Sequence, residues 1–293
     1  MLKVIKSGFY TTIQDTGRFG HRAYGVPVSG AMDAYSSQFA NSILGNANDA
    51  ALLEITMTGP ILHFLEPTII AVSGANFQPK LNDSPIKMNV SVSIETNDIL
   101  SFGRVNIGFR AYIAIKDGVL SKTVLGSRSM YKPVTSASRI MNNDTLDYNS
   151  IVNNQRTLNA VVKYNKDLIE NHILDVYKGP EFNSLPIDKQ NQLLESSFFV
   201  SKRNSRMAYQ LEPAFENNLE PILTAPVLPG TIQLTPSGQL IVLMRDCQTT
   251  GGYPRVLQLT QKAINSLSQQ TTGSTLKFRL KELQCKKMIN NNL

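Results

Sequence analysis

Gly59-Pro-Ile-Leu-His-Phe-Leu-Glu-Pro-Thr-Ile-Ile-Ala-Val72 sets the pattern for the whole chain, with two short apolar runs joined by a proline turn. Runs of this length, bounded by Gly and Pro, are typical of β-strands. The order of glycine, strand, proline turn and strand returns in Gly230-Thr-Ile-Gln-Leu-Thr-Pro-Ser-Gly-Gln-Leu-Ile-Val-Leu243. Two copies of one β-unit would explain this echo, and a chance likeness between two hairpins would explain it equally well.

Short apolar segments of the same kind continue along the rest of the chain, each bounded by Gly, Pro, Asn or Asp. They predict strands at 2–5, 61–65, 69–72, 90–94, 99–102, 112–115, 160–164, 173–177, 198–201, 232–234, 240–244 and 276–280. Long helices do not alternate regularly with these segments, so the pattern favours barrels or sandwiches over a parallel α/β sheet. We therefore predict a mainly β fold with a few short helices.

Three segments have helical spacing instead. The clearest is 31–44, where apolar residues recur three or four positions apart. We predict that Ser29 is the N-cap of this helix and that Gly45 is the glycine that follows its last turn. Shorter helices are predicted at 187–195 and 261–267. A polar and poorly periodic stretch at 142–156 is typical of a surface connection near the middle of the chain.

The length of 293 residues exceeds that of most single domains, so we predict two domains that share an interface. A hydrophobic content of 42% is ample for packed cores. No apolar run approaches the roughly 20 residues that a membrane-spanning helix needs. The first residues also lack the apolar stretch and the cleavage site of a secretory signal. We expect a cytoplasmic protein with no membrane partner.

The formal charge of +7 raises nucleic acid as a partner, because basic proteins bind its phosphates. The basic residues gather at 202–206 and 281–287, without the interleaved aromatic side chains of a base-stacking surface. A solvated face and a basic tail explain them better, so we expect no nucleic-acid partner. We expect Cys247 and Cys285 to be reduced thiols. The three histidines are far apart in the sequence and lack the close spacing of zinc ligands, so we expect no metal site.

Two segments near opposite ends of the chain are dense in turn residues and polar side chains: 8–33 and 246–255. The planar guanidinium of arginine can form two hydrogen bonds with a carboxylate, and the side chains of Gln and Thr can form hydrogen bonds with an amide. These segments therefore suit a small substrate with a carboxylate or amide group. The candidate site residues are Gln14, Asp15, Arg18, Ser29, Asp33, Arg206, Tyr209, Asp246, Thr249, Thr250, Gly251, Gly252 and Tyr253.

Each candidate has a structural alternative, since turns use the same residue types. Asp15 and Asp246 can cap turns, Arg18 can pin a loop, and the stretch 251–254 can be a tight turn. The chain has no P-loop, no Gly-x-Gly-x-x-Gly after a strand and no Gly-x-Ser-x-Gly elbow. Nucleotide sites and serine-hydrolase sites of those standard kinds are therefore excluded. His21 alone is a weak basis for a catalytic triad.

Several long motifs follow one another along nearly the whole chain. They are Thr11-Thr-Ile-Gln-Asp-Thr-Gly-Arg18, Gly25-Val-Pro-Val-Ser-Gly-Ala-Met-Asp33, Ala40-Asn41 with Gly45-Asn46, Leu53-Glu-Ile55, Leu125-Gly-Ser-Arg128, Ser205-Arg-Met-Ala-Tyr-Gln-Leu211, Pro226-Val-Leu-Pro-Gly-Thr-Ile-Gln233 and 246–254. In this order they resemble the biotin-dependent carboxyltransferase family, also called allophanate hydrolase subunit 2. The chain departs from the family pattern at 117–119, Ala208 and Ile264. The resemblance implies two cyclophilin-like β-barrel domains, which we place at 1–120 and 121–293.

The resemblance also implies an activity and partners. Stand-alone members act with a KipI-like subunit and a LamB/YcsF-like subunit in the ATP-dependent opening of 5-oxoproline to L-glutamate. By this resemblance we expect the complex to use ATP, the substrate to be a small amide, and this chain to hold no covalently bound cofactor. Larger relatives transfer a carboxyl group from biotin to urea, but this chain lacks an Ala-Met-Lys-Met motif and cannot carry biotin itself.

Two alternatives stay open. One is a carboxyltransferase component that acts on a small amide with a separate biotin carrier. The other is a regulatory protein that antagonises a KipI-type kinase inhibitor.

The mechanistic hypothesis is that the two polar segments converge on one site. Arg18 or Arg206 would hold a substrate carboxylate. The catalytic candidates would orient the amide, move protons or position a phosphorylated intermediate, and they are Gln14, Asp15 and Asp246.

Overall fold

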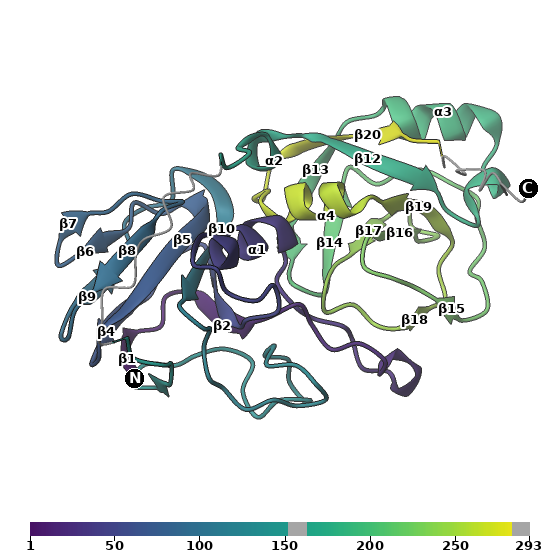
Figure 1. Cartoon of the computed structure of the whole chain (residues 1–293). Helices are drawn as coiled ribbons and strands as arrows, with labels where there is room; N and C mark the ends of the chain where they lie inside the picture. The colour runs from purple at the N-terminus through teal and green to yellow at the C-terminus, as the bar shows by residue number, and fades with distance from the viewer. Residues whose placement is uncertain (152–162, 283–293) are drawn as a thin grey trace, which may run out of the picture.

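The computed structural model describes residues 1–151 and 163–282, and it shows two mainly β units side by side (Figure 1). Four short α-helices accompany the strands in this part of the chain, which confirms the predicted mainly β class. None of the helices in these two ranges is long and apolar enough to cross a bilayer. The predicted connection at 142–156, the strand at 160–164, Cys285 and the basic stretch 281–287 lie partly or wholly outside the described residues.

The first unit is built from two sheets. The six-stranded sheet has the order β11 (Thr145–Leu146), β1 (Leu2–Lys6), β4 (Ile61–Phe64), β9 (Ile99–Ser101), β6 (Lys80–Leu81) and β7 (Ser84–Pro85). The five-stranded sheet has the order β2 (Tyr10–Gln14), β3 (Leu52–Thr56), β10 (Ile107–Ile115), β5 (Thr68–Asn76) and β8 (Ser91–Ile94). Apolar side chains from both sheets, such as Val4, Phe64, Leu53 and Ile113, form one buried core between them.

The second unit is a closed barrel of seven strands. Its order is β12 (Ile173–Lys178), β19 (Arg255–Leu259), β16 (Thr231–Leu234), β17 (Leu240–Leu243), β14 (Ala208–Glu212), β13 (Phe198–Asn204) and β20 (Thr275–Leu280). The ring closes where β12 runs parallel to β20, and the other neighbouring pairs are antiparallel. Closure leaves no sheet edge exposed. A two-stranded ribbon of β15 (Ala225–Pro226) and β18 (Thr250–Gly251) lies outside the ring.

The echo between 59–72 and 230–243 does not come from one repeated hairpin. In the second unit β16 and β17 pair directly, with Ile232 opposite Val242. In the first unit β4 pairs with β1 and β9, whereas β5 pairs with β10 and β8 in the other sheet. The interpretation as two copies of one β-unit is therefore wrong, because the same strand, turn and strand pattern is compatible with a paired hairpin and with a crossing between sheets.

The segment 121–148 packs against the first unit, although the predicted division at residue 120 assigns it to the second. β11 pairs with β1, and Ile140 donates its backbone N–H to the carbonyl of Thr11 at 2.9 Å. Ile140 and Leu146 belong to the core of the first unit. This packing favours a division after residue 148.

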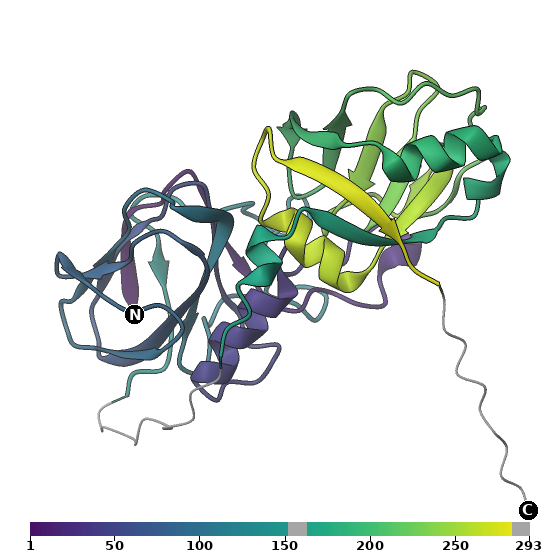
Figure 2. The same ribbon diagram turned by 90° about the horizontal axis from the view of Figure 1, so that it is seen from above.

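The helices are α1 (Ala34–Ile43), α2 (Asp167–Glu170), α3 (Ile187–Glu195) and α4 (Gln261–Ser268), and they agree with the three predicted segments, with α2 added. Figure 2 shows α1, α2 and α4 where the two units meet. α1 begins later than predicted, because its N-cap is Asp33 rather than Ser29: the Asp33 carboxylate accepts the backbone N–H of Ser36 at 3.1 Å. Ser29 instead has a φ of 60° in the preceding loop.

Replacing Asp33 by alanine should lower the free energy of unfolding by about 1–2 kcal/mol, the usual cost of losing a helix cap. Asp33 is fully buried and also accepts the Ser36 hydroxyl and the Gln269 amide, so these donors would lose their partner. Urea titration of the variant measures this loss. Asp188→Ala is the matched control, because Asp188 is exposed in the first turn of α3 and the N-cap there makes no side-chain bond. Equal midpoints for the two variants would contradict the prediction.

Candidate functional site

The two polar segments, far apart in sequence, meet between the two units. The loop before α1 extends from the first unit toward β15 and β18 (Figure 1). Arg22, in the 3₁₀ turn of this loop (η1, Arg22–Tyr24), donates a hydrogen bond to the carbonyl of Val227 and a long one to that of Thr249 at 3.4 Å. The backbone N–H of Ser29 donates to the carbonyl of Arg245 at 3.0 Å. The predicted convergence of the two segments is thus present in the structure.

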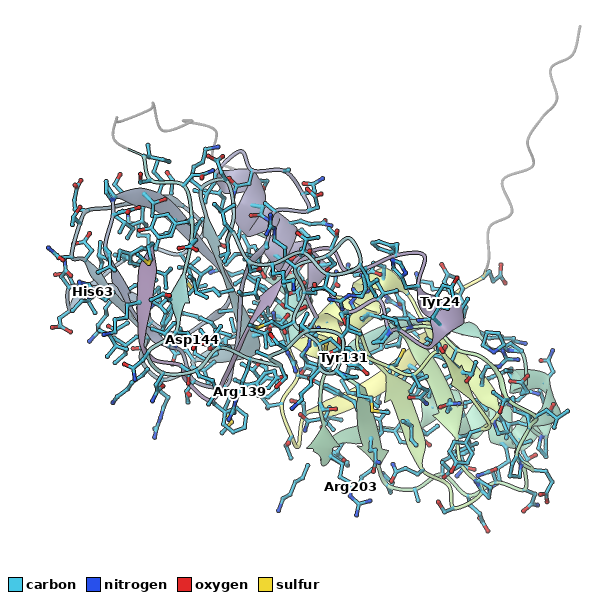
Figure 3. The ribbon with its side chains drawn as sticks, turned by 90° about the horizontal axis from the view of Figure 1, so that it is seen from below. Tyr24, His63, Tyr131, Arg139, Asp144 and Arg203 are labelled. Carbon is cyan, nitrogen blue, oxygen red and sulfur yellow. The ribbon has the colours of Figure 1, made fainter. Side chains whose placement is uncertain are left out.

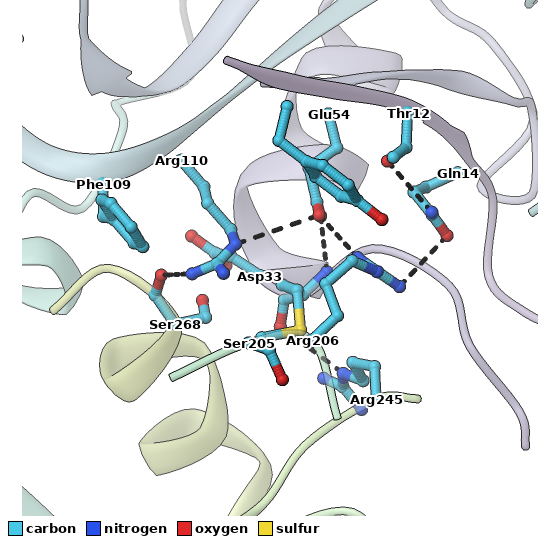
Figure 4. Close-up of polar contacts among 12 residues, drawn as sticks. Thr12, Gln14, Asp33, Glu54, Phe109, Arg110, Ser205, Arg206, Arg245 and Ser268 are labelled. Carbon is cyan, nitrogen blue, oxygen red and sulfur yellow. Dashed lines mark hydrogen bonds and ion pairs between the residues drawn. The ribbon is translucent and has the colours of Figure 1, made fainter. Parts of the chain in front are cut away.

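The centre of this contact is Arg206, a buried side chain that follows β13 and reaches into the first unit (Figure 4). It donates to Asp246 of its own unit at 2.7 Å. It also donates to three groups of the first unit: Glu54 at 2.5 Å, the carbonyl of Gly30 at 2.7 Å and, more weakly, Gln14 at 3.3 Å. We call Gln14, Glu54, Arg110, Arg206 and Asp246 the interface network. One guanidinium therefore links both units.

Glu54 lies on β3 and is 1% exposed. It accepts the backbone N–H of Met32 at 2.7 Å and the phenol of Tyr112 at 3.0 Å. The guanidinium of Arg110, on β10, lies 3.9 Å away. Burial and the neighbouring Glu54 carboxylate raise the pKa of Tyr112 well above its usual value, so this phenol stays a donor. A buried carboxylate is stable only with this many partners.

The arginines of the interface network stay charged. Burial alone would lower the pKa of Arg206, but Asp246 and Glu54 reverse this effect and raise the pKa above its usual value. Arg110 donates to the phenol oxygen of Tyr209 at 2.6 Å and to the carbonyl of Ser268 at 2.5 Å. Tyr209, a predicted substrate-binding residue, is therefore fully buried as a partner of Arg110.

Asp15 and Arg18, predicted for catalysis and for substrate binding, hold a loop at 127–129. The carboxylate of Asp15 accepts the hydroxyls of Ser127 and Ser129, each at 2.6 Å. Arg18 is 0% exposed and donates to the carbonyl of Ser129 and to the hydroxyl of Ser29. In this arrangement Asp15 and Arg18 hold the loops of the first unit together, Arg18 fully buried and Asp15 partly exposed.

The remaining predicted residues divide between the interface and the surface. Ser29 and Asp33 are buried, Ser29 beneath Arg18 and Asp33 as the cap of α1. The stretch 249–253 forms β18 and the turn after it, and there Thr250 and Tyr253 are exposed.

Asp246 is the least buried member of the interface network, at 9% exposed. Two half-buried phenols lie near it. Burial raises the pKa of Tyr10, and Asp246 and Glu54 add to this against an opposing effect of Arg206. Burial and Asp246 likewise raise the pKa of Tyr131, which lies where the two units meet (Figure 3). Asp246 is therefore the more exposed of the two carboxylates of the interface network, and a carboxylate is a group that general acid and base catalysis can use.

The main residues missed by the predicted site are Glu54, Arg110 and Tyr112. Glu54 had a usable signal: it is the one charged residue in the run Leu52-Leu-Glu-Ile-Thr56, in which every residue is buried. A carboxylate in an otherwise apolar strand is rarely buried unless it is paired, so it indicates a partner. Arg110 and Tyr112 are its partners on the adjacent strand, with Tyr112 directly opposite Glu54.

The surface has two hollows of note. The larger, about 1180 Å³, lies between β5 to β7 and α2, and it contains none of the predicted site residues. The smaller, about 390 Å³, lies on the barrel and includes Tyr253 together with Gln248 and Gln233. Within the described ranges, no three His, Cys, Asp or Glu residues are grouped so that they could hold a metal ion.

Cys247 should react slowly in the native protein. The thiol is buried, and burial raises its pKa to about 11 against an opposing effect of Arg22. Compared with the usual value of 9.0, this shift lowers the thiolate fraction at pH 8 about 100-fold. In a Cys285→Ser background, a thiol reagent should label native Cys247 at least about 100-fold more slowly than the unfolded chain. Equal rates would contradict the buried position.

The same shift predicts a pH dependence of stability. Above pH 9 the Cys247 thiol of the unfolded chain ionises first, so its contribution to stability should fall as the pH rises toward about 11. Urea titrations between pH 8 and pH 11 measure this effect. The free energy of unfolding should fall less with rising pH in a Cys247→Ala variant than in the wild-type chain.

The comparisons with known proteins agree over most of the chain. The family described as carboxyltransferase domain, subdomain A and B, matches residues 24–280. The C subunit of the Escherichia coli 5-oxoprolinase is 30% identical, and the match covers 95% of this chain and 90% of that protein. The crystal structure of TTHA0988 is similar with a TM-score of 0.85 at 27% identity, covering 95% of this chain and 55% of that one.

The crystal structure of the Kluyveromyces lactis urea carboxylase is similar with a TM-score of 0.82 at 26% identity. That match covers 94% of this chain and 27% of the carboxylase. The present chain thus spans about half or less of the length of these two structural relatives.

Proposed function

The chain belongs to the family of carboxyltransferase domains with subdomains A and B, and from this premise we propose that it serves as the C subunit of a 5-oxoprolinase. The observation that carries the proposal is the likeness to the Escherichia coli C subunit along nearly the full length of both chains. The name of that relative implies a complex of several proteins. We propose that the other members are a KipI-like and a LamB/YcsF-like protein.

The proposed reaction opens the lactam ring of 5-oxoproline. The C–N bond breaks, water supplies the oxygen of the new carboxylate, and the nitrogen leaves as the amino group of L-glutamate. The complex hydrolyses ATP in the process. This chain carries none of the standard nucleotide-binding motifs, so we assign ATP to no residue of it and propose no covalently bound cofactor.

In this proposal Asp246 accepts and returns the proton at the interface between the two units, and Arg206 positions it. Arg206 already donates to both carboxylates of the interface network and to the carbonyl of Gly30. It is therefore a positioning residue and does not hold the substrate carboxylate.

Reconstitution tests the proposal. The purified chain is mixed with a KipI-like and a LamB/YcsF-like protein from the same source, and release of glutamate and ADP from 5-oxoproline and ATP is measured. We expect turnover with all three proteins and none when this chain is omitted. Full turnover in the mixture without this chain would overturn the proposal.

A second candidate is the carboxyltransferase step toward a small amide, with biotin on a separate carrier protein. The observation that favours it is the likeness of 94% of this chain to part of the urea carboxylase. Transfer of a carboxyl group from a carboxylated biotin carrier to urea, with no ATP-dependent glutamate release, would establish this candidate instead.

A further inference from the structure

The smaller hollow lies on the outside of the barrel. Several of its lining residues are close neighbours of Arg206 and Asp246 along the chain. Ser205 and Met207 line it, while Arg206 between them turns inward. Gln248 lines it two residues after Asp246. The hollow and the interface network therefore draw residues from the same two segments of the chain.

Two amide side chains in the hollow have unused hydrogen-bonding capacity. The Oε1 atom of Gln248 is buried and has no hydrogen-bond partner within the described part of the chain. The Nε2 atom of Gln233 makes only a long bond of 3.4 Å to the carbonyl of Tyr253. A buried acceptor without a partner is costly, so it indicates a donor supplied by a ligand. One acceptor and one donor suit the N–H and C=O of an amide.

The position of the Gln233 side chain depends on a glycine. A Cβ atom at Gly251 would lie 2.4 Å from Nε2 of Gln233, closer than atoms can approach. At the adjacent Gly252 the nearest atom would be 3.5 Å away, which is ordinary contact. The absence of a side chain at Gly251 therefore keeps the Gln233 amide at the wall of the hollow.

The rest of the lining supplies positive charge and apolar surface. Lys202 and Arg203 are exposed at the rim, and neither forms an ion pair with another described residue. Arg203 lies on the outer edge of the barrel (Figure 3). The apolar part includes Ile241 and Leu243, and Tyr253 is 40% exposed beside them. A volume of about 390 Å³ lies within the range of roughly 300–1,000 Å³ for small-molecule sites.

We propose that this hollow binds a small cyclic amide that carries a carboxylate. Gln248 accepts the amide N–H, Gln233 donates to the amide carbonyl, and Arg203 pairs with the carboxylate. The inference rests on the proposed function, since 5-oxoproline is such a molecule, and it deepens that function by assigning the substrate to a hollow whose lining residues Ser205, Met207 and Gln248 neighbour Arg206 and Asp246 in the chain.

The test measures KM for 5-oxoproline in the reconstituted complex. Gln248→Leu should raise KM about 10- to 100-fold, as expected for a lost hydrogen bond to a buried group, and Arg203→Gln should raise it roughly two- to fivefold, because its pair with the carboxylate is exposed. The compound 2-pyrrolidinone has the lactam without the carboxylate. Its inhibition constant should rise in Gln248→Leu and stay unchanged in Arg203→Gln.

Matched controls lie on the same barrel. Arg279→Gln replaces an exposed arginine outside the hollow and should leave KM unchanged. Gly251→Ala should raise KM more than Gly252→Ala, because only the first displaces Gln233. Unchanged KM values in Gln248→Leu and Arg203→Gln, with an active wild-type complex, would overturn this inference and leave the proposed function standing.

A wild-type complex without any turnover would overturn the proposed function instead. Calorimetry of 5-oxoproline binding to the isolated chain then tests the hollow by itself. Binding that weakens in both variants supports the site, and no binding by the wild-type chain overturns it.

Discussion

Arg206→Met is expected to lower the free energy of unfolding by about 3–5 kcal/mol, the cost of leaving buried charges without their partner. Methionine roughly fills the space, so little of this loss comes from a cavity. Glu54 and Asp246, which are 1% and 9% exposed, would both lose their guanidinium. Urea unfolding, followed by a probe in each unit, measures the loss. Because Arg206 joins the two units, we expect their transitions to separate in the variant.

A double-mutant cycle distinguishes the charge from other causes. Glu54→Gln alone leaves Arg206 with Asp246, and Glu54→Gln combined with Arg206→Met removes one anion together with the cation. The double variant should lose clearly less than the sum of the single losses. Arg279→Ala is the control, since its ion pair with Asp175 is exposed and should add nothing measurable. Additive losses would refute a direct coupling across the interface.

Asp246→Asn is expected to lower kcat of the reconstituted complex by roughly 10²–10⁴-fold, the range for losing a general acid or base. The fold should survive, because Arg206 keeps its bonds to Glu54 and Gly30 and asparagine keeps one acceptor. Turnover of 5-oxoproline at saturating substrate measures the effect, and the elution volume of the complex checks assembly.

Two comparisons separate catalysis from positioning at Asp246. Asp246→Glu should restore part of the activity that Asp246→Asn loses, because it returns a carboxylate. Asp175→Asn, on β12, should behave as wild type, because the Asp175 carboxylate pairs with Arg279 and Lys281 and not with the interface network. An Asp246→Asn complex with kcat within about twofold of wild type would discard the proposed role.

The sequence predicted many of the strands, because the evidence for them is local. It missed β2, β3, β14 and β19, each of which has polar residues within its run. Alternating apolar runs between turn residues indicate a strand wherever its partner lies, and segments such as 173–177 and 276–280 fall on β12 and β20. Pairing is not local. The stretches 59–72 and 230–243 share one pattern, yet only the second forms a hairpin.

The site shows the same limit. The meeting of Gln14, Arg206 and Asp246 was predicted, and these three side chains are in contact. For Asp15 and Arg18 the sequence left two roles open, because a polar loop that binds a ligand and one that binds another loop use the same residues. Only their contacts with Ser127, Ser129 and Ser29 distinguish the two cases.

The amino-acid sequence by itself determined the mainly β class, three of the helices and the two polar segments, since each follows from the spacing of neighbouring residues. The tertiary structure decided which charges are buried against each other. Glu54 and Arg206 are 152 positions apart and 2.5 Å from each other. No local pattern encodes that distance, because it depends on how two separately formed cores pack and on the need of a buried carboxylate for a cation.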